Sequence, residues 1–338
     1  IKFETNKLNE MRKHFFLFFF FGLVACKKEE ELNQNSKISK ITTGNGPEDI
    51  IIDESISPAR ILVSCSARRD NQTENGEIYQ LNCDNDSTSI LPRIGEPHNF
   101  VFNPHGIDIY KNGDESFLYV ISHYAIDSVD VIAKYKIQPD RLVFEQYFTN
   151  PIMVSANAIS VLPNGSFYVT NDDGGGDIVY EQLFNQEGGS IVYCNLENKW
   201  KKVANKLRFP NGLANKNGIL YVATSRNKAL FTFDINADNT LSNKTALNQL
   251  DGQDNLRWNG NDLLVSVHPN QLKFAINAFN PNSISPIQSY SIDIVSGKKK
   301  LLFEDNGNII SSASTTLIYN GNLYLAQIFD PFVLKVKL

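Results

Sequence analysis

Short apolar runs, most of them preceded by a polar turn, recur along nearly the whole chain. The runs are rich in the β-branched and aromatic residues that favour strands. They are ILVSCS at 61–66, FLYVISH at 117–123, FYVTND at 167–172, LYVATS at 220–225, LLVSVH at 263–268 and LYLAQI at 323–328. Five of the six follow a turn such as PNGS, KNG or NGN. Further strand candidates, such as 132–137 and 229–235, lie between them. This pattern predicts an all-β protein.

The spacing of the runs indicates the architecture. Successive runs begin 43 to 60 residues apart, and about 45–50 residues is the length of one four-stranded propeller blade. A pair of β-sandwiches is the alternative, but it does not explain why one phrase recurs at nearly constant spacing. The sequence therefore predicts a six-bladed β-propeller over residues 41–338, with four antiparallel strands per blade and a central tunnel.

A second phrase precedes each turn. The phrases are PEDII at 47–51, PHGID at 104–108, ANAIS at 156–160, PNGLA at 210–214, QDNLR at 253–257 and SASTT at 312–316. If each phrase opens the innermost strand of a blade, all six face the tunnel at one height. The side chains brought together are then Glu48, His105, Asn157, Asn211, Asp254 and Asn255.

This ring is a candidate calcium site. Two carboxylates and several amide oxygens suit calcium, which takes 6–8 oxygen ligands in flexible geometry. A transition metal would be expected to recruit the histidine as well. Taken singly, the asparagines and aspartates read as ordinary turn residues, but their common place in the repeat favours a shared site.

The N-terminus predicts export. From Met11, the expected true start, basic residues precede a short apolar run that ends in LVAC at Cys26. The run is too short for a membrane span and fits a signal peptide over residues 1–25. LVAC resembles the lipobox of bacterial lipoproteins, with Cys26 lipidated; a plain signal peptide is the alternative. Residues 26–40 are polar and predict a flexible tether. We therefore expect a protein anchored through Cys26 to a membrane of the bacterial cell envelope, the outer membrane.

Composition excludes some partners. The chain has 338 residues, of which 42% are hydrophobic, and a net charge of −5, which argues against nucleic-acid binding. We expect a monomer. Of the remaining cysteines, Cys65 and Cys83 could pair, but buried thiols are the favoured interpretation, with Cys194 also free. No cysteine–histidine spacing predicts a zinc site.

The phrases resemble those of the paraoxonase family. From GPEDI onward, the segments NPHGI (103–107), SH (122–123), FYVTND (167–172), FPNGL (209–213), DN (254–255), VHPN (267–270) and SSAS…YNG (311–321) follow the family's order. The resemblance implies a calcium-dependent six-bladed lactonase or arylesterase. It places the catalytic calcium on Glu48, Asn157, Asn211, Asp254 and Asn255. It makes His105 and His123 a histidine dyad, supported by Asp172.

The sequence departs from the family pattern at two points. The family's second, structural calcium uses the aspartate at Asp49, the carbonyl of Ile107 and an aspartate where this chain has Ala158. The missing carboxylate weakens the case for that ion. Animal members also close the ring with a disulfide, whereas this chain has no cysteine after Cys194, so closure must depend on strand pairing.

The expected activity is hydrolysis of lactones or aryl esters, with calcium polarising the carbonyl and the dyad activating water. Two alternatives stay open. One is a propeller like the gluconolactonases or strictosidine synthases, with a different substrate. The other is a non-catalytic binding lipoprotein that keeps the ion for structure only.

Overall fold

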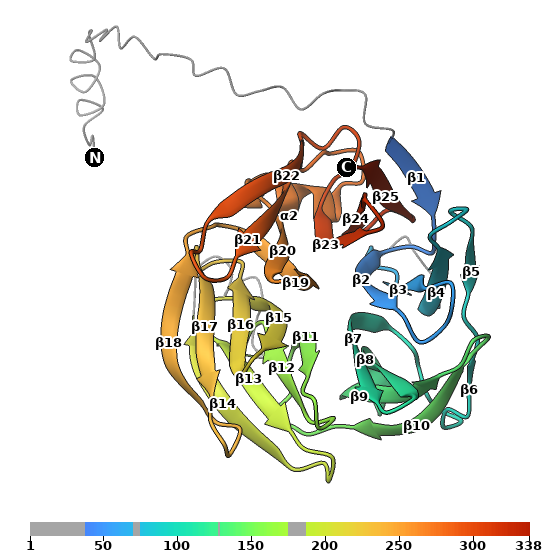
Figure 1. Ribbon diagram of the computed structural model, residues 1–338, viewed down its shortest axis with the longest axis vertical. Helices are drawn as coiled ribbons and strands as arrows, with labels where there is room; N and C mark the ends of the chain where they lie inside the picture. Colours follow the sequence, from blue (N-terminus) through green and yellow to red (C-terminus); the bar gives the residue numbers. More distant parts are fainter. Residues whose placement is uncertain (1–37, 70–74, 128, 175–186) are drawn as a thin grey trace, which may run out of the picture. The chain divides into compact units, whose positions relative to one another are not determined.

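Six antiparallel sheets surround a central axis in the described part of the chain (Figure 1). The structure is a computed structural model, and it describes residues 38–69, 75–127, 129–174 and 187–338. Each sheet has four antiparallel strands, and one of them carries a fifth, β6, which pairs in parallel with β10. The predicted six-bladed propeller is confirmed.

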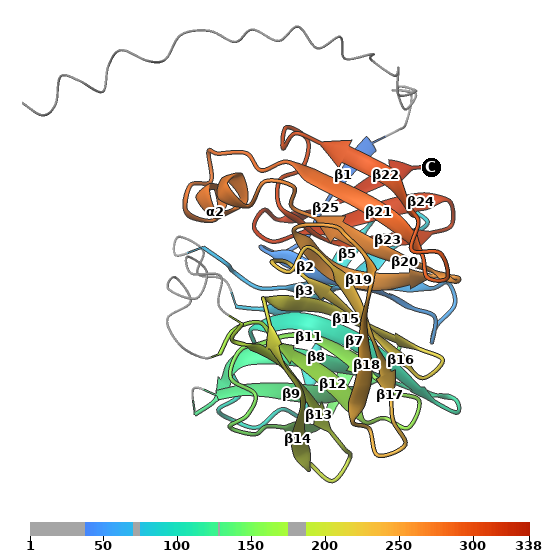
Figure 2. The ribbon, with the colours of Figure 1, turned by 90° about the vertical axis from the view of Figure 1, so that its left-hand side faces the viewer.

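In each blade the first-named strand lies at the axis and the last at the rim. The first four blades are β2 (Pro47–Asp53), β3 (Arg60–Cys65), β4 (Glu77–Asn82), β5 (Thr88–Ile90); β7 (Pro104–Asn112), β8 (Glu115–Ile126), β9 (Val129–Ile137), β10 (Leu142–Phe148), β6 (Arg93–Ile94); β11 (Ala156–Val161), β12 (Phe167–Asn171), β13 (Gly189–Cys194), β14 (Trp200–Leu207); and β15 (Pro210–Lys216), β16 (Ile219–Thr224), β17 (Leu230–Ile235), β18 (Leu241–Asn248). The last two are β19 (Gln253–Asn259), β20 (Asp262–Val267), β21 (Ile287–Asp293), β22 (Lys299–Asp305); and β23 (Ala313–Tyr319), β24 (Asn322–Gln327), β25 (Phe332–Lys337), β1 (Ile38–Thr42). Helix α2 (Gln271–Phe279) stands out from one face of the ring (Figure 2).

The ring closes by strand pairing, as predicted. Strand β1 from the beginning of the described chain pairs antiparallel with β25 from its end, from Ile38 opposite Val336 to Thr42 opposite Phe332. The last blade is therefore built from both ends of the propeller. Its first strand begins at Ile38, three residues before the predicted domain boundary.

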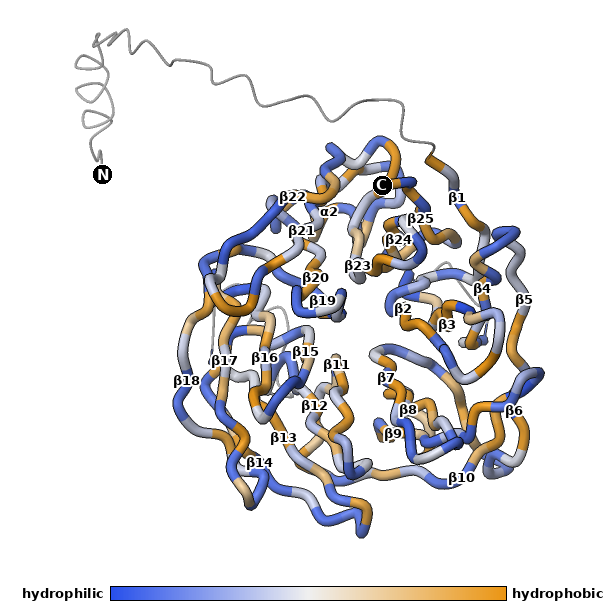
Figure 3. Tube along the Cα trace, in the orientation of Figure 1, coloured by the Kyte–Doolittle hydropathy of each residue, from blue (hydrophilic) through white to orange (hydrophobic). Residues whose placement is uncertain are grey.

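Hydrophobic clusters lie between neighbouring blades. One joins Phe117 and Ile121 of one blade to Val169 and Val192 of the next, and five similar clusters join the other neighbours among the described residues. The outer strand β18 is largely exposed and mostly hydrophilic (Figure 3). Because the core lies between blades, the polar inner strands are left free to line the axis.

The inner strands share one irregularity. In every blade the pairing of the inner strand with its neighbour shifts register within the first four residues, for example between Pro47 and Asp49 and between Ala156 and Ile159. A bulge of this kind re-aims the side chain that it carries. It falls on the residues predicted to form the ring.

The structure bears on the predictions for the cysteines but not on those for the N-terminal segment. Cys65, Cys83 and Cys194 are buried, free thiols, so the Cys65–Cys83 disulfide is not formed. The signal segment, Cys26 and most of the tether lie outside the described residues. Within the described residues, no helix has the length and apolar character needed to cross a bilayer.

Candidate functional site

The ring residues lie at the axis on consecutive inner strands. The contacts between inner strands run from β2 to β7, β11, β15, β19 and β23 and back to β2. The predicted calcium ligands are buried on four of them: Glu48 on β2, Asn157 on β11, Asn211 on β15, and Asp254 and Asn255 on β19. Glu48 and Asn255 are far apart in sequence, yet the Asn255 amide Nδ2 donates to Glu48 Oε1 at 2.9 Å. The geometry therefore brings the predicted residues together.

Four buried oxygen atoms in this ring have no hydrogen-bond partner among the described residues. They are Glu48 Oε2, Asn157 Oδ1, Asn211 Oδ1 and Asp254 Oδ1. A buried oxygen without a partner costs about 1–3 kcal/mol, and more when it is charged. Four such atoms, one on each of four predicted ligands, fit the ligand preference of calcium.

The amide groups are oriented by bonds on their far side. Asn157 Nδ2 donates to Asp172 Oδ2 at 3.1 Å, which leaves its oxygen for the ring. In the described residues, no group of three or more His, Cys, Asp or Glu side chains is placed to hold a metal. The ring is not such a group, because only two of its predicted ligands are carboxylates. The other predicted ligands are asparagine amides.

Burial makes ionisation of Glu48 and Asp254 unfavourable. Burial raises the pKa of Glu48, although Arg68 and Asn255 lower it. Burial also raises the pKa of Asp254 to about 6, and the charge of Glu48 adds to that rise. A divalent cation between them would remove both penalties.

His268 supports one of these carboxylates. Its Nε2 lies 2.8 Å from Asp254 Oδ2, and its ring stacks on Phe274 of α2 at 4.2 Å. The phrase VHPN appeared only as part of a resemblance, and the sequence did not mark His268 as a site residue. Its signal is a histidine directly after β20, whose last residue pairs with Gln253 at the ligand end of β19.

We expect His268→Ala to weaken calcium binding by roughly 10- to 100-fold, because partners that orient a ligand carboxylate have effects of this size. Isothermal calorimetry with calcium measures the change. The matched control is His98→Ala, which removes an exposed histidine. Unchanged affinity in His268→Ala would show that Asp254 does not need this partner.

The two histidines predicted to form a dyad are in contact. His105 on β7 and His123 on β8 approach each other, with His105 Nδ1 2.7 Å from His123 Nε2. On its other side, His105 Nε2 lies 3.5 Å from Glu48 Oε1, so His105 stands between the dyad partner and the ring. Burial, followed by the charges of Arg68 and His123, lowers the pKa of His105 well below its usual value.

The carboxylate beside the dyad is Asp130, and this corrects the prediction of Asp172. His123 Nδ1 lies 3.0 Å from Asp130 Oδ2, and the Tyr124 N–H donates to Asp130 Oδ1 at 3.1 Å. Tyr124 has a φ of 51°, so the chain leaves regular strand geometry at the place where it presents both groups to Asp130. Burial opposes ionisation of Asp130, but the hydrogen bond and charge of His123 leave its pKa below the usual value.

Asp172 lies instead beside the predicted ligand Asn157. Its Oδ1 accepts from Ser155 and its Oδ2 accepts from the Asn157 amide. The reason is positional: Asp172 follows β12, beside the inner strand that carries Asn157, whereas Asp130 lies across the β8–β9 hairpin from His123. Asp172 therefore positions the side chain of the predicted ligand Asn157.

Replacing these two aspartates by asparagine distinguishes the roles. We expect Asp130→Asn to lower kcat by roughly 10²-fold or more while calcium affinity is kept, because His123 loses the carboxylate that fixes its tautomer and, through it, that of His105. Asp172→Asn should mainly weaken calcium binding. Steady-state kinetics and calorimetry on both variants check this pair; the reverse outcome would restore Asp172 to the dyad.

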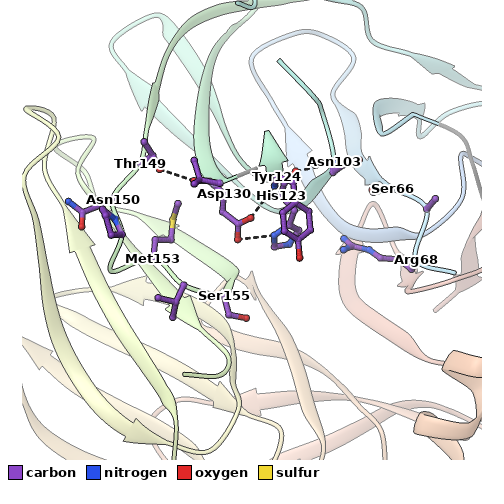
Figure 4. Close-up of a pocket in the computed structure, with 14 residues that line it drawn as sticks. Ser66, Arg68, Asn103, His123, Tyr124, Asp130, Thr149, Asn150, Met153 and Ser155 are labelled. Atoms are coloured by element: carbon purple, nitrogen blue, oxygen red, sulfur yellow. Dashed lines mark hydrogen bonds and ion pairs between the residues drawn. The ribbon is translucent and has the colours of Figure 1, made fainter. Parts of the chain in front are cut away.

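A cavity of about 880 Å³ opens beside the dyad (Figure 4). Figure 4 shows His123 and Asp130 on its wall, with Arg68 on one side and Met153 on the other. Arg68 Nη2 donates to the Pro104 carbonyl at 3.1 Å. The volume is in the range of small-molecule sites. Polar and apolar residues share its lining.

The groups predicted for a second calcium also meet. The Ile107 N–H donates to Asp49 Oδ2 at 2.9 Å. However, the side chain of Ala158 is part of a hydrophobic cluster, and Arg257 hydrogen-bonds to both Asp49 and the Ile107 carbonyl. These residues do not fit a second ion.

Known proteins resemble this chain in sequence and in fold. The family model for arylesterase matches residues 67–333. Serum paraoxonase/arylesterase 1 of Mus musculus is 26% identical over 262 residues, which cover 75% of this chain and 74% of the mouse protein. Serum paraoxonase/lactonase 3 of Homo sapiens is 25% identical over 277 residues, covering 76% and 75%.

Two solved structures share the fold. A gluconolactonase from Xanthomonas campestris has a TM-score of 0.58 at 13% identity, over 90% of each chain. A luciferin-regenerating enzyme has a TM-score of 0.58 at 14% identity, over 90% of this chain and 95% of that one. At these identities the likeness concerns the fold alone. The family model, in contrast, spans well over half of the sequence, and the chain belongs to the arylesterase family.

Proposed function

We propose that this protein is a calcium-dependent hydrolase of lactones or aryl esters. The observation that carries the proposal is the set of four buried ring oxygens that have no partner in the described part of the chain, together with a histidine relay beside them. Glu48 belongs to the ring and its Oε1 lies 3.5 Å from His105 Nε2. Membership in the arylesterase family and the relatives described as arylesterases and lactonases support a hydrolase.

The relay defines where a proton can be accepted. Asp130 accepts from His123 Nδ1–H, so in neutral His123 the Nε2 lone pair is free to accept from His105 Nδ1–H. His105 Nε2 then carries a lone pair and faces Glu48. A neutral imidazole in this tautomer can take a proton from water at Nε2.

The ring supplies the second element of the mechanism. Glu48, Asn157, Asn211, Asp254 and Asn255 would hold the calcium ion. The bound ion would supply Lewis-acid chemistry, polarising the ester carbonyl and stabilising the developing oxyanion. His105 then accepts the proton of the attacking water, while His123 and Asp130 stabilise the charge that His105 gains.

A substrate panel tests the proposal. The purified protein is assayed against γ- and δ-lactones, long-chain lactones and aryl acetates, with calcium and with a chelator. We expect at least one class of substrate to be hydrolysed when calcium is present and none to be hydrolysed in the chelator. Calcium binding without hydrolysis of any member would favour the non-catalytic binding protein. Hydrolysis of sugar lactones only would favour a gluconolactonase-like substrate.

A further inference from the structure

Arg257 is a buried arginine on the inner strand β19, two residues beyond the ring residue Asn255. Its Nη2 donates to Asp49 Oδ2 at 2.6 Å and to the Ile107 carbonyl at 2.9 Å. Its Nε donates to the Ile50 carbonyl at 2.8 Å, and its Nη1 to the Leu256 carbonyl at 3.0 Å. One guanidinium thus joins three inner strands, β2, β7 and β19, across the axis.

The contacts of Nη2 leave no room for a metal between the same two oxygens. Calcium binds oxygen at 2.3–2.6 Å. An ion at that distance from both Asp49 Oδ2 and the Ile107 carbonyl oxygen would occupy the space of Nη2, which lies 2.6 and 2.9 Å from them. The ion could enter only if the arginine left.

The carboxylate of Asp49 is also fully used. Its Oδ1 accepts from the Ile50 N–H and from Thr315 Oγ1, both at 2.9 Å. Its Oδ2 accepts from the Ile107 N–H as well as from Arg257. Unlike Glu48 and Asp254, it presents no unpartnered oxygen among the described residues.

The negative charge of Asp49 is balanced by the positive charge of Arg257. Asp49 is 3% exposed and Arg257 10%, so the ion pair is screened little by solvent. A second, half-buried carboxylate, Asp108, also feels the charge of Arg257. Arginine keeps its charge under all ordinary conditions, so this group of inner strands carries a permanent cation.

We propose that Arg257 takes the place of a second calcium ion, so that Asp49 and Ile107 form a metal-free support and the protein binds calcium only in the ring. The arginine ties β2, β7 and β19 together, which is the task a structural ion would perform. The proposal concerns Asp49 and is independent of whether the ring is catalytic.

Counting bound calcium tests this most simply. Wild-type protein and the ring variant Glu48→Gln/Asp254→Asn are dialysed against calcium, and the bound metal is measured by mass spectrometry. We expect one calcium per chain in the wild type and none in the ring variant. Two in the wild type, or one that persists in the ring variant, would overturn the inference. None in either protein agrees with the arginine assignment but rejects the proposed function.

Stability measurements test the arginine itself. In saturating calcium, Arg257→Gln should lower Tm by roughly 5–10 °C, because Asp49 is left as an uncompensated buried charge. Adding Asp49→Asn should restore more than half of that loss, since neither charge then remains. If Asp49→Asn restores nothing, Arg257 does not serve Asp49 and the inference fails.

A matched control uses another buried ion pair. Arg60 Nε lies 2.8 Å from Asp53 Oδ2, with both side chains buried. Arg60→Gln should also lower Tm, but Asp49→Asn should not restore it. Equal restoration of both arginine variants would mean that Asp49→Asn is a general stabiliser and would remove the evidence for a specific pair. Should Arg257→Gln fail to fold, the double variant and the wild-type calcium count still decide.

Discussion

Glu48→Gln and Asp254→Asn should each reduce hydrolysis by roughly 10³-fold or more, because each removes a charged ligand proposed for the ion that would stabilise the oxyanion. The propeller should stay folded. Each substitution keeps the shape of the side chain, and without calcium it relieves repulsion, since the charge of Glu48 raises the pKa of Asp254. The wild type should therefore be more stable than the variant only when calcium is present.

Two measurements separate loss of the ion from loss of the fold. Circular dichroism should show the same β-sheet signal in variant and wild type, whereas calcium should raise Tm only in the wild type. Glu54→Gln, at an exposed carboxylate just after β2, is the matched control and should behave as wild type. A Glu48 variant that keeps full activity would remove the ring from the mechanism.

His105→Gln should lower kcat by roughly 10²- to 10⁴-fold, the range expected for loss of a general base. Calcium affinity should change little, because His105 lies beside Glu48 at 3.5 Å and is not one of the ligands proposed for the ion. Turnover of a lactone and calorimetric calcium binding are measured on the same preparation.

The exposed histidine His98 gives the control for this variant, and His98→Gln should leave both quantities unchanged. If His105→Gln loses activity only because calcium is lost, His105 supports the ring and the base must be sought elsewhere. If it keeps full turnover, water is activated without the dyad.

The repeat made the ring predictable. Glu48, Asn157, Asn211 and Asp254 were placed together because the same phrase opens each innermost strand, and a closed propeller puts equivalent positions at one height. The pattern could not show the register shift in all six inner strands, which aims these side chains into the axis. A bulge depends on backbone geometry, and no residue type in these phrases marks it.

The residues that support the dyad and Asp49 were harder to predict. Asp130 is seven residues from His123, and its position depends on the β8–β9 hairpin, in which Tyr124 near the end of β8 and Asp127 just after it have positive φ. Arg257 appeared in the sequence only as the end of the phrase QDNLR. Its role depends on contacts with β2 and β7, about 150 to 208 residues away. Nothing local in the sequence marks contacts of that range.

The most direct test of the account is a calcium titration in which hydrolysis and bound calcium are followed together. Protein stripped with a chelator is returned to increasing free calcium, and lactone or aryl-ester turnover is compared with ring occupancy. The account predicts that activity is absent in the chelator and rises in proportion to the single bound calcium. Full hydrolysis by metal-free protein would contradict it.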